Sequence, residues 1–96
     1  MLNLQRVAQF VAVVEAGGFT AAAQSIQQTK AAISFNVRQL EAELGVSLLV
    51  RSTRRVALTQ AGEVFYQRAL QLLRESEALV EDVQGHHGGF SGELSI

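Results

Sequence analysis

Residues 21–40 read AAAQSIQQTKAAISFNVRQL, and this stretch decides the fold. Its first part combines high helix propensity with small side chains, which let another helix approach closely. Residues 27–28 leave room only for a minimal turn. Thr29 suits the N-cap of the next helix, because a threonine hydroxyl can accept a hydrogen bond from a free backbone N–H group. The stretch therefore predicts two short helices joined by a tight turn, a helix-turn-helix.

Apolar spacing predicts the helices on either side of this turn. The second helix of the pair is expected over 29–44, and Gly45 ends it. An earlier helix ends at Gly17-Gly18, and Thr20 is expected to cap the helix that follows. The buried stripe of helix 29–44 consists of Ile33, Val37, Leu40 and Leu44. The inward stripe of the earlier helix consists of Leu4, Val7, Ala8, Val11 and Val14, widened by Phe10 and Val13.

A short hairpin is predicted after Gly45. Two apolar runs, Leu48–Val50 and Val56–Leu58, flank a polar loop at 51–55 that carries three arginines, and we expect the runs to pair as strands. The predicted fold class is therefore mainly α. It is a winged helix-turn-helix of three helices plus a two-stranded wing, followed by a long dimerisation linker helix.

This long helix is predicted over 59–84 and begins at Thr59. Its apolar residues repeat in two neighbouring stripes, which gives the helix two surfaces to cover. We expect one stripe to face its own domain and the other a second copy of the chain, although both could face one broad core. The expected dimer contacts are Phe65, Ala69, Leu72, Leu79 and Val83. The second stripe consists of Tyr66, Leu70, Leu73 and Val80.

The glycine-rich composition at 85–89 is typical of a flexible linker. Residues 93–96 alternate polar and apolar side chains, like a strand whose sheet is absent. The expected organisation is a winged helix-turn-helix domain at 1–58, a dimerisation helix at 59–84, and a hinge with the start of a further domain at 85–96.

The net charge of −1 is unevenly distributed. Residues 1–58 hold six basic and three acidic side chains, a balance of +3, whereas residues 59–96 hold two basic and six acidic ones, a balance of −4. A polyanion would be attracted to the first half of the chain and repelled by the second.

Composition and motifs argue against several other classes. The 96 residues support one compact domain, and no cysteine is present for a disulfide or a thiolate metal site. The apolar runs are too short for a membrane span, and the first residues lack the pattern of a signal peptide. The histidines, His86 and His87, lie in the glycine-rich segment, and no nucleophile is paired with a base. We therefore expect a cytoplasmic protein that is not an enzyme and holds no metal or cofactor here.

The outer face of helix 29–44 suits double-stranded DNA, because a helix fits the major groove with its N-terminal turn against the bases. Lys30 and Ser34 can hydrogen-bond to base edges, and Ala31 and Phe35 can touch a thymine methyl group. Plain alternatives remain: the face is only solvated, Lys30 binds phosphate, or Phe35 turns into the core.

Phosphate contacts are expected around this face. Arginines in loop 51–55 suit phosphates or a minor groove, although such a cluster also serves as a solubilising surface. Helix N-termini bind phosphate through free backbone N–H groups, and a threonine marks each of the two N-termini here. The predicted phosphate and wing contacts are Thr20, Thr29, Arg38, Arg51, Arg54 and Arg55.

Over essentially its whole length the chain resembles the N-terminal DNA-binding region of LysR-type transcriptional regulators. The resemblance rests on short motifs in a specific order and spacing: Leu4 with Phe10-Val11-Ala12-Val13-Val14-Glu15, then Gly18-Phe19-Thr20-x-Ala22-Ala23, Ala32-Ile33-Ser34 leading into Val37-Arg38-Gln39-Leu40-Glu41, Glu43-Leu44-Gly45-Val46-x-Leu48, Arg51-x-x-Arg54 with Val56-x-Leu58-Thr59, and Ala61-Gly62. The chain departs from the family at Lys30-Ala31, commonly Gln-Pro, at Phe35, usually polar or basic, and at Leu49, often Phe. The departures at Lys30 and Phe35 concern which bases are recognised, not the fold.

The resemblance implies a winged helix-turn-helix, a linker helix that pairs in a homodimer, and a C-terminal effector-binding domain that lies beyond this chain and binds a small-molecule inducer. Such proteins act as bacterial activators or repressors and generally form tetramers. The family's base-reading positions fall on Lys30, Ala31, Ser34 and Phe35, and its wing arginine on Arg54.

Two hypotheses follow for the function. The preferred one is sequence-specific binding of double-stranded DNA by a dimeric transcription regulator. The competing one is a protein-interaction module, in which the same fold only pairs subunits or docks a partner and Phe35 is the anchor.

Overall fold

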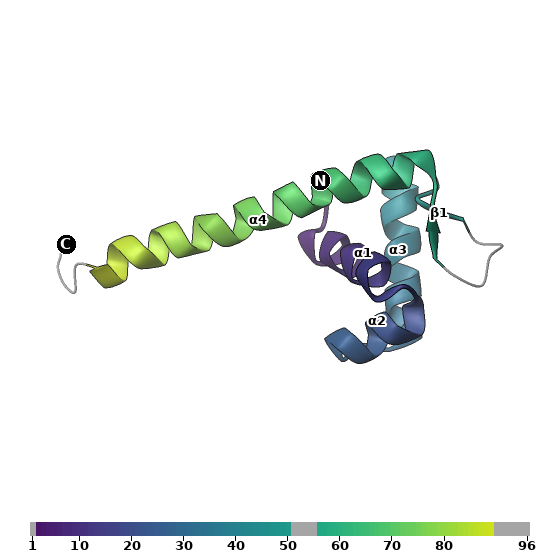
Figure 1. The fold of residues 1–96 in the computed structure, drawn as a ribbon, viewed down its shortest axis with the longest axis horizontal. Coiled ribbons are helices and arrows are strands. Elements are labelled where there is room, and N and C mark those ends of the chain that lie inside the picture. Colours follow the sequence, from purple (N-terminus) through teal and green to yellow (C-terminus); the bar gives the residue numbers. More distant parts are fainter. Residues whose placement is uncertain (1, 51–55, 90–96) are drawn as a thin grey trace.

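The computed structural model describes residues 2–50 and 56–89. Three helices pack into a small core, and a fourth leaves this core as a long single rod (Figure 1). The elements are α1 (Leu4–Ala16), α2 (Phe19–Ile26), α3 (Lys30–Leu44), β1 (Leu49–Val50), β2 (Ala57–Leu58) and α4 (Gln60–Gly89). This is the mainly helical fold with a two-stranded wing that the sequence predicts.

The first helix, α1, is capped at both ends by its own sequence. The side chain of Asn3 accepts hydrogen bonds from two backbone N–H groups of the first turn, and Gly17 ends the helix in the left-handed conformation with φ 85°. Its buried face is centred on Phe10 and Val13, because α2, α3 and α4 all pack against it. The expected inward positions of Leu4 and Ala8 were wrong: both are exposed, since they lie on the side of the helix away from Phe10.

The short helix α2 begins two residues earlier than expected. Gly18, in extended backbone, is its N-cap, and no side chain caps it, so the prediction that Thr20 caps this helix was wrong. Thr20 instead lies exposed in the first turn. Ala22 is completely buried, which fits the close helix approach that small side chains permit.

Helix α3 begins and ends as the sequence predicts. The Thr29 hydroxyl accepts a hydrogen bond from the Ala32 N–H at 3.0 Å, and Gly45 takes the left-handed conformation at the other end. Ile33, Val37 and Leu40 are completely buried. Leu44 was wrongly expected in this stripe: as the last residue of α3 it lies exposed at the rim of the core.

The wing is an antiparallel pair in which Leu49 faces Leu58 and Val50 faces Ala57. Its base is fixed by a cluster of polar contacts that we call the wing joint, formed by Glu41, Ser47, Leu48, Thr59 and Gly62. A carboxylate oxygen of Glu41 accepts hydrogen bonds from the backbone N–H groups of Leu48 and Leu49, at 2.7 and 3.2 Å. The Thr59 hydroxyl donates to the Ser47 carbonyl at 2.6 Å and accepts from the Gly62 N–H at 2.9 Å. The wing joint therefore ties α3, β1 and the start of α4 together.

Helix α4 packs against α1 through its first half only. The Phe65 ring meets Phe10 edge-on, with centroids 5.4 Å apart, and Ala69 is only 3% exposed. Beyond this region α4 has no other described element beside it (Figure 1). No helix within residues 2–50 and 56–89 is long and apolar enough to cross a membrane.

Helix α4 also runs further than expected. It continues through Gly89, so the prediction of a flexible linker at 85–89 was wrong. A helix already formed gains one hydrogen bond for each added residue, which offsets the cost of about 1 kcal/mol that each glycine carries. The last part of the expected hinge, 90–96, lies outside the described residues.

Candidate nucleic-acid interface

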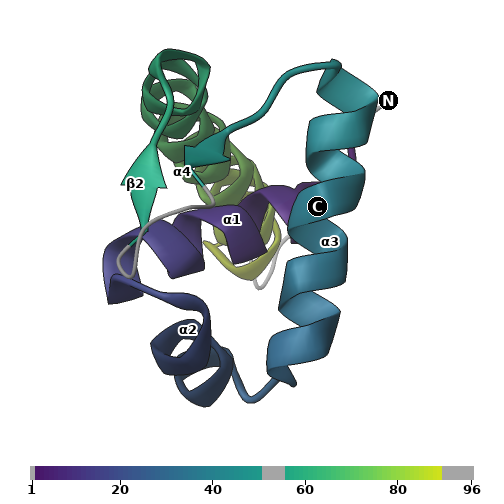
Figure 2. The same cartoon turned by 90° about the vertical axis from the view of Figure 1, so that its right-hand side faces the viewer.

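The turn between α2 and α3 is as short as predicted and has an unusual backbone. Gln27 adopts the left-handed conformation with φ 57°, which a residue other than glycine or asparagine seldom does. The N–H groups of Gln27 and Gln28 both donate to the Ala23 carbonyl. This closed turn sets the direction in which α3 leaves α2 (Figure 2).

The first turn of α3 offers hydrogen-bond donors outward. The N–H groups of Ala32 and Ile33 are satisfied by the hydroxyl and carbonyl oxygens of Thr29. The preceding N–H groups, those of Lys30 and Ala31, have no acceptor within a helix, because the first turn lacks a turn before it. A helix end of this kind attracts phosphate oxygens.

The predicted base-reading residues gather on one outward surface of α3, which we call the α3 face. Lys30 and Ala31 are exposed, and Ser34 is half-buried. Phe35 is 57% exposed, so the alternative that its ring turns into the core was wrong. Arg38 follows on the same side and is also exposed. The α3 face thus combines one ammonium, one guanidinium, one hydroxyl and two apolar groups.

Positive charge at the α3 face is available for an outside partner. Arg6 is turned toward Glu43 on the far part of α3, with 3.6 Å between the charged groups, whereas Lys30 and Arg38 are exposed. The wing arginines Arg51, Arg54 and Arg55 lie outside the described residues, so their place beside the α3 face stays a prediction. The Glu41 hydrogen bonds hold the start of the wing against α3.

The predicted dimer residues on α4 divide into two groups. Phe65 is half-buried and Ala69 is buried, and both pack into the core of their own chain. Leu72, Leu79 and Val83 are 41%, 64% and 62% exposed, and Val64 and Val80 are exposed as well. The exposed aliphatic surface of α4 therefore consists of Val64, Leu72, Leu79, Val80 and Val83, which we call the α4 stripe.

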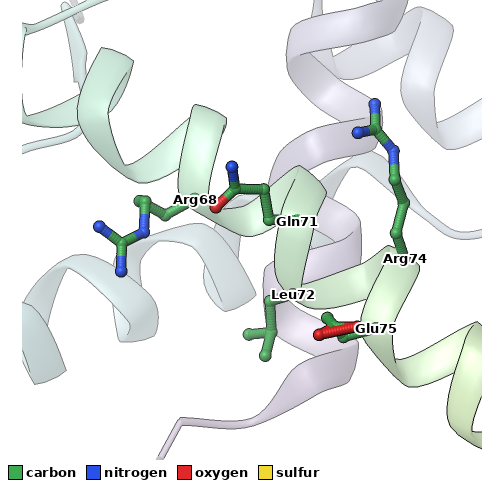
Figure 3. A pocket seen from close by; sticks show the side chains of 5 residues that line it. All are labelled: Arg68, Gln71, Leu72, Arg74 and Glu75. Carbon is green, nitrogen blue, oxygen red and sulfur yellow. The ribbon is translucent and has the colours of Figure 1, made fainter.

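Polar side chains border the α4 stripe around Leu72. An open depression there is lined by Arg68, Gln71, Leu72, Arg74 and Glu75. Figure 3 shows that the guanidinium groups of Arg68 and Arg74 point away from each other. The two cations do not converge on one anion, and the depression is a border of the apolar surface.

A set of polar residues between α1 and α3 was not predicted from the sequence. Gln9 is only 5% exposed, and its side-chain oxygen accepts a hydrogen bond from the Asn36 amide at 2.7 Å. Arg6 donates to the carbonyl oxygen of the same amide at 3.2 Å. The sequence shows only that Gln9 adjoins Phe10 and that Asn36 adjoins Val37. Which of these polar side chains form hydrogen bonds with each other depends on how the helices cross.

One titratable group links α1 to α4 away from the α3 face. The Tyr66 hydroxyl donates to a carboxylate oxygen of Glu15 at 3.4 Å. Burial raises the pKa of Tyr66 above its ordinary value, and repulsion between the phenolate and the Glu15 carboxylate raises it further.

Comparison with known proteins gives a consistent result. Residues 4–63 match the family model described as bacterial regulatory helix-turn-helix protein, lysR family. The chain is 43% identical over 95 residues to the HTH-type transcriptional regulator PtxR of Pseudomonas aeruginosa, covering 99% of this chain and 30% of that protein. It is 42% identical over 96 residues to the HTH-type transcriptional activator AaeR of Escherichia coli, covering 100% of this chain and 31% of that protein. The chain thus spans about a third of the length of these relatives.

Solved structures share the fold. The complex of the BenM DNA-binding domain with catB site 1 DNA matches with a TM-score of 0.89 and 36% identity, covering 92% of this chain and 95% of that one. CbnR, a LysR family transcriptional regulator, matches with a TM-score of 0.83 and 33% identity, covering 88% of this chain and 29% of that one.

Proposed function

The chain belongs to the lysR family of bacterial regulatory helix-turn-helix proteins, and from this premise we propose that it binds double-stranded DNA sequence-specifically as part of a transcription regulator. The observation that carries the proposal is the α3 face, an outward helix surface with a cation, a hydroxyl and an exposed ring at its N-terminal end. A helix of this kind fits the major groove. The role is one of binding rather than catalysis, in the cytoplasm, where bacterial DNA lies.

The residues of the α3 face take different parts in this proposal. Lys30 and Ser34 contact base edges, and Ala31 and Phe35 contact thymine methyl groups. Arg38 binds the phosphate backbone. Further phosphate contacts come from Thr20, Thr29, Arg51, Arg54 and Arg55, which position the domain without selecting a sequence.

We also propose that the chain forms a homodimer through the α4 stripe. An apolar stripe of five exposed aliphatic side chains on a helix that leaves its core is typical of an interaction surface. A two-fold dimer presents two α3 faces to two half-sites of DNA. For a protein as long as these relatives, we further propose that it forms a tetramer and contains a domain that binds an inducer.

Selection of bound duplexes from a random pool tests the DNA proposal directly. Sequence-specific binding enriches one motif with two-fold symmetry. The affinity for the enriched duplex falls with salt, with a slope of log K against log salt of about −0.9 for each phosphate neutralised. Failure to enrich any motif, with no binding to random duplex even at low salt, would leave the protein-interaction module as the better account, with exposed Phe35 as its anchor.

A further inference from the structure

Three polar side chains connect α1 to the inner side of α3, and together we call them the α1–α3 polar bridge: Arg6, Gln9 and Asn36. The Asn36 side-chain amide both donates and accepts a hydrogen bond. Its NH2 group donates to the Gln9 side-chain oxygen at 2.7 Å, and its carbonyl oxygen accepts from Arg6 Nε at 3.2 Å. Both ends of one short side chain are therefore committed to α1.

The polar bridge lies against an apolar contact between the same helices. Phe10 of α1 and the Ile33 and Val37 side chains of α3 are completely buried, and Gln9 beside them is 5% exposed. Apolar contacts have no preferred direction, so they tolerate a small rotation or slide of one helix on the other. Hydrogen bonds are directional, and a buried amide that loses its partner is costly. The polar bridge therefore permits one register of α3 on α1.

Arg6 extends this control along the axis of α3. Its Nε contacts Asn36, and its Nη1 lies 3.6 Å from Glu43, seven residues further along the helix. Seven residues correspond to about two turns, or roughly 10 Å of helix. One guanidinium thus holds α3 at two separate points, which limits its tilt as well as its rotation.

The position of Asn36 connects the bridge to the α3 face. Asn36 directly follows Phe35, and successive side chains of a helix are about 100° apart. A fixed inward direction for Asn36 therefore fixes the outward direction of Phe35 and, through the rigid helix, of Lys30 and Ser34. Base recognition depends on such directions, because donors and acceptors must meet base edges in a defined geometry.

We propose that Arg6, Gln9 and Asn36 are positioning residues for base recognition, which hold α3 in the one register that aims the α3 face at the bases. This proposal rests on the proposed DNA-binding function. Its consequence is that the bridge contributes to discrimination between DNA sequences more than to stability, since apolar residues of similar size would hold the two helices together equally well.

The test replaces the bridge by apolar side chains of similar size, in the double variant Gln9→Leu with Asn36→Leu. The matched control is Gln5→Leu, the same exchange on an exposed position of α1 one turn earlier. Two duplexes of equal length serve as probes: the one that the unaltered chain enriches from a random pool, and a shuffled version of it. Titrations at one salt concentration give the ratio of the two affinities, and thermal unfolding gives stability.

We expect the double variant to unfold at the same temperature as the unaltered chain or higher and to bind the shuffled duplex equally well. Its preference for the enriched duplex should fall about fivefold or more, the effect of losing one well-placed base contact. The control should keep its preference. An unchanged preference in the folded double variant overturns the proposal.

A second variant guards against a double variant that does not fold. In the single variant Gln9→Leu the Asn36 amide keeps Arg6 but loses the Gln9 oxygen that accepts from its NH2 group, and the variant should lose the same preference. Preference retained in folded Gln9→Leu also overturns the proposal. If the unaltered chain binds both duplexes equally, the proposed sequence-specific DNA binding is wrong, and the bridge proposal is wrong with it. If the unaltered chain prefers the enriched duplex and the folded variants keep that preference, only the bridge proposal is wrong.

Discussion

Neighbouring side chains of α3 differ sharply in what they face. Ile33 and Phe35 are both large and apolar and lie two residues apart, yet Ile33 is completely buried whereas Phe35 is 57% exposed. Two helical steps of about 100° place them on nearly opposite sides. The hydrophobic effect explains Ile33, but the exposure of Phe35 calls for an outside contact, and a thymine methyl group in the major groove would provide one.

Base selection should depend on the side chains of the α3 face individually. Removal of the Ser34 hydroxyl by Ser34→Ala, or of the Lys30 ammonium by Lys30→Ala, should change the preferred base at one position and cost about 1–3 kcal/mol there. Binding to a series of duplexes with single-base changes measures this. A uniform loss across the series for Lys30→Ala would instead identify Lys30 as a phosphate contact.

Glycine at position 62 is required by space. A Cβ there would collide with the Leu48 carbonyl oxygen, which is backbone and already accepts a hydrogen bond from the Thr59 N–H. Gly62→Ala should destabilise the fold by about 1–3 kcal/mol, the usual cost of overpacking, as measured by denaturant unfolding.

Gly85→Ala is the matched control, because Gly85 lies in the same helix with nothing within 4 Å of the added Cβ. It should stabilise α4 by up to about 1 kcal/mol and raise its helical content in circular dichroism. Equal destabilisation by both variants would contradict the steric explanation.

Contacts between elements give each helix a fixed place, and most of them come from residues far apart in the sequence. The wing joint connects α3, β1 and α4, and the polar bridge connects α1 and α3. The Tyr66 hydroxyl connects α4 to Glu15 of α1. These links are side-chain hydrogen bonds at the edges of an apolar core.

The contact between α1 and α4 should respond to high pH. The pKa of Tyr66 is raised in the folded chain, so its stabilising contribution is complete below the unfolded value of about 10 and is lost as pH rises through the folded pKa. Because the chain has one tyrosine, its ultraviolet absorbance during a pH titration reports this group alone.

Glu15→Gln should lower the titration midpoint of Tyr66, since the carboxylate no longer repels the phenolate. Thermal unfolding over the same pH range should lose its dependence on pH at a correspondingly lower value. A midpoint that does not move on this substitution would mean that burial alone sets the pKa.

The elements were largely predictable from the sequence, and their partners were not. The cap at Thr29, the stop at Gly45 and the exposed Phe35 follow from local chemistry and helical spacing. The prediction that Thr20 caps α2 was wrong because the helix begins at Phe19, with Gly18 as its N-cap. The buried Gln9 and the exposed Leu4 depend on how α1 crosses three other helices, which spacing within α1 does not contain.

At the scale of the whole molecule, the chain consists of a small core and one long helix that extends beyond it (Figure 1). The core uses Phe65 and Ala69 of α4, and most of the α4 stripe lies further along, where no other described element stands beside the helix. This division runs along the helix and cuts across the two predicted stripes, because Phe65 and Ala69 of the expected dimer stripe pack into the core. The first part stabilises the domain, and the exposed second part carries the proposed dimer contacts.

Charged residues on the α4 stripe should therefore convert a dimer into a monomer without unfolding the core. In the variant Leu79→Glu with Val83→Glu, sedimentation should show the mass of one chain, and thermal unfolding should lose only the contribution of pairing. Gln84→Glu is the control, since it adds one glutamate charge at an exposed position outside the stripe. If the double variant sediments like the unaltered chain, pairing occurs elsewhere.

The length of α4 has a mechanical consequence. Thirty residues at about 1.5 Å each make a lever of about 45 Å that is anchored at one end. A swing of about 5° at the anchored end would displace the far end by about 4 Å, close to the rise of one base pair along the DNA axis. In the proposed dimer, the angle at which α4 leaves the core, held by the close approach of Gly62 to Leu48 and by the packing of Phe65 and Ala69, would therefore set the distance between the two α3 faces.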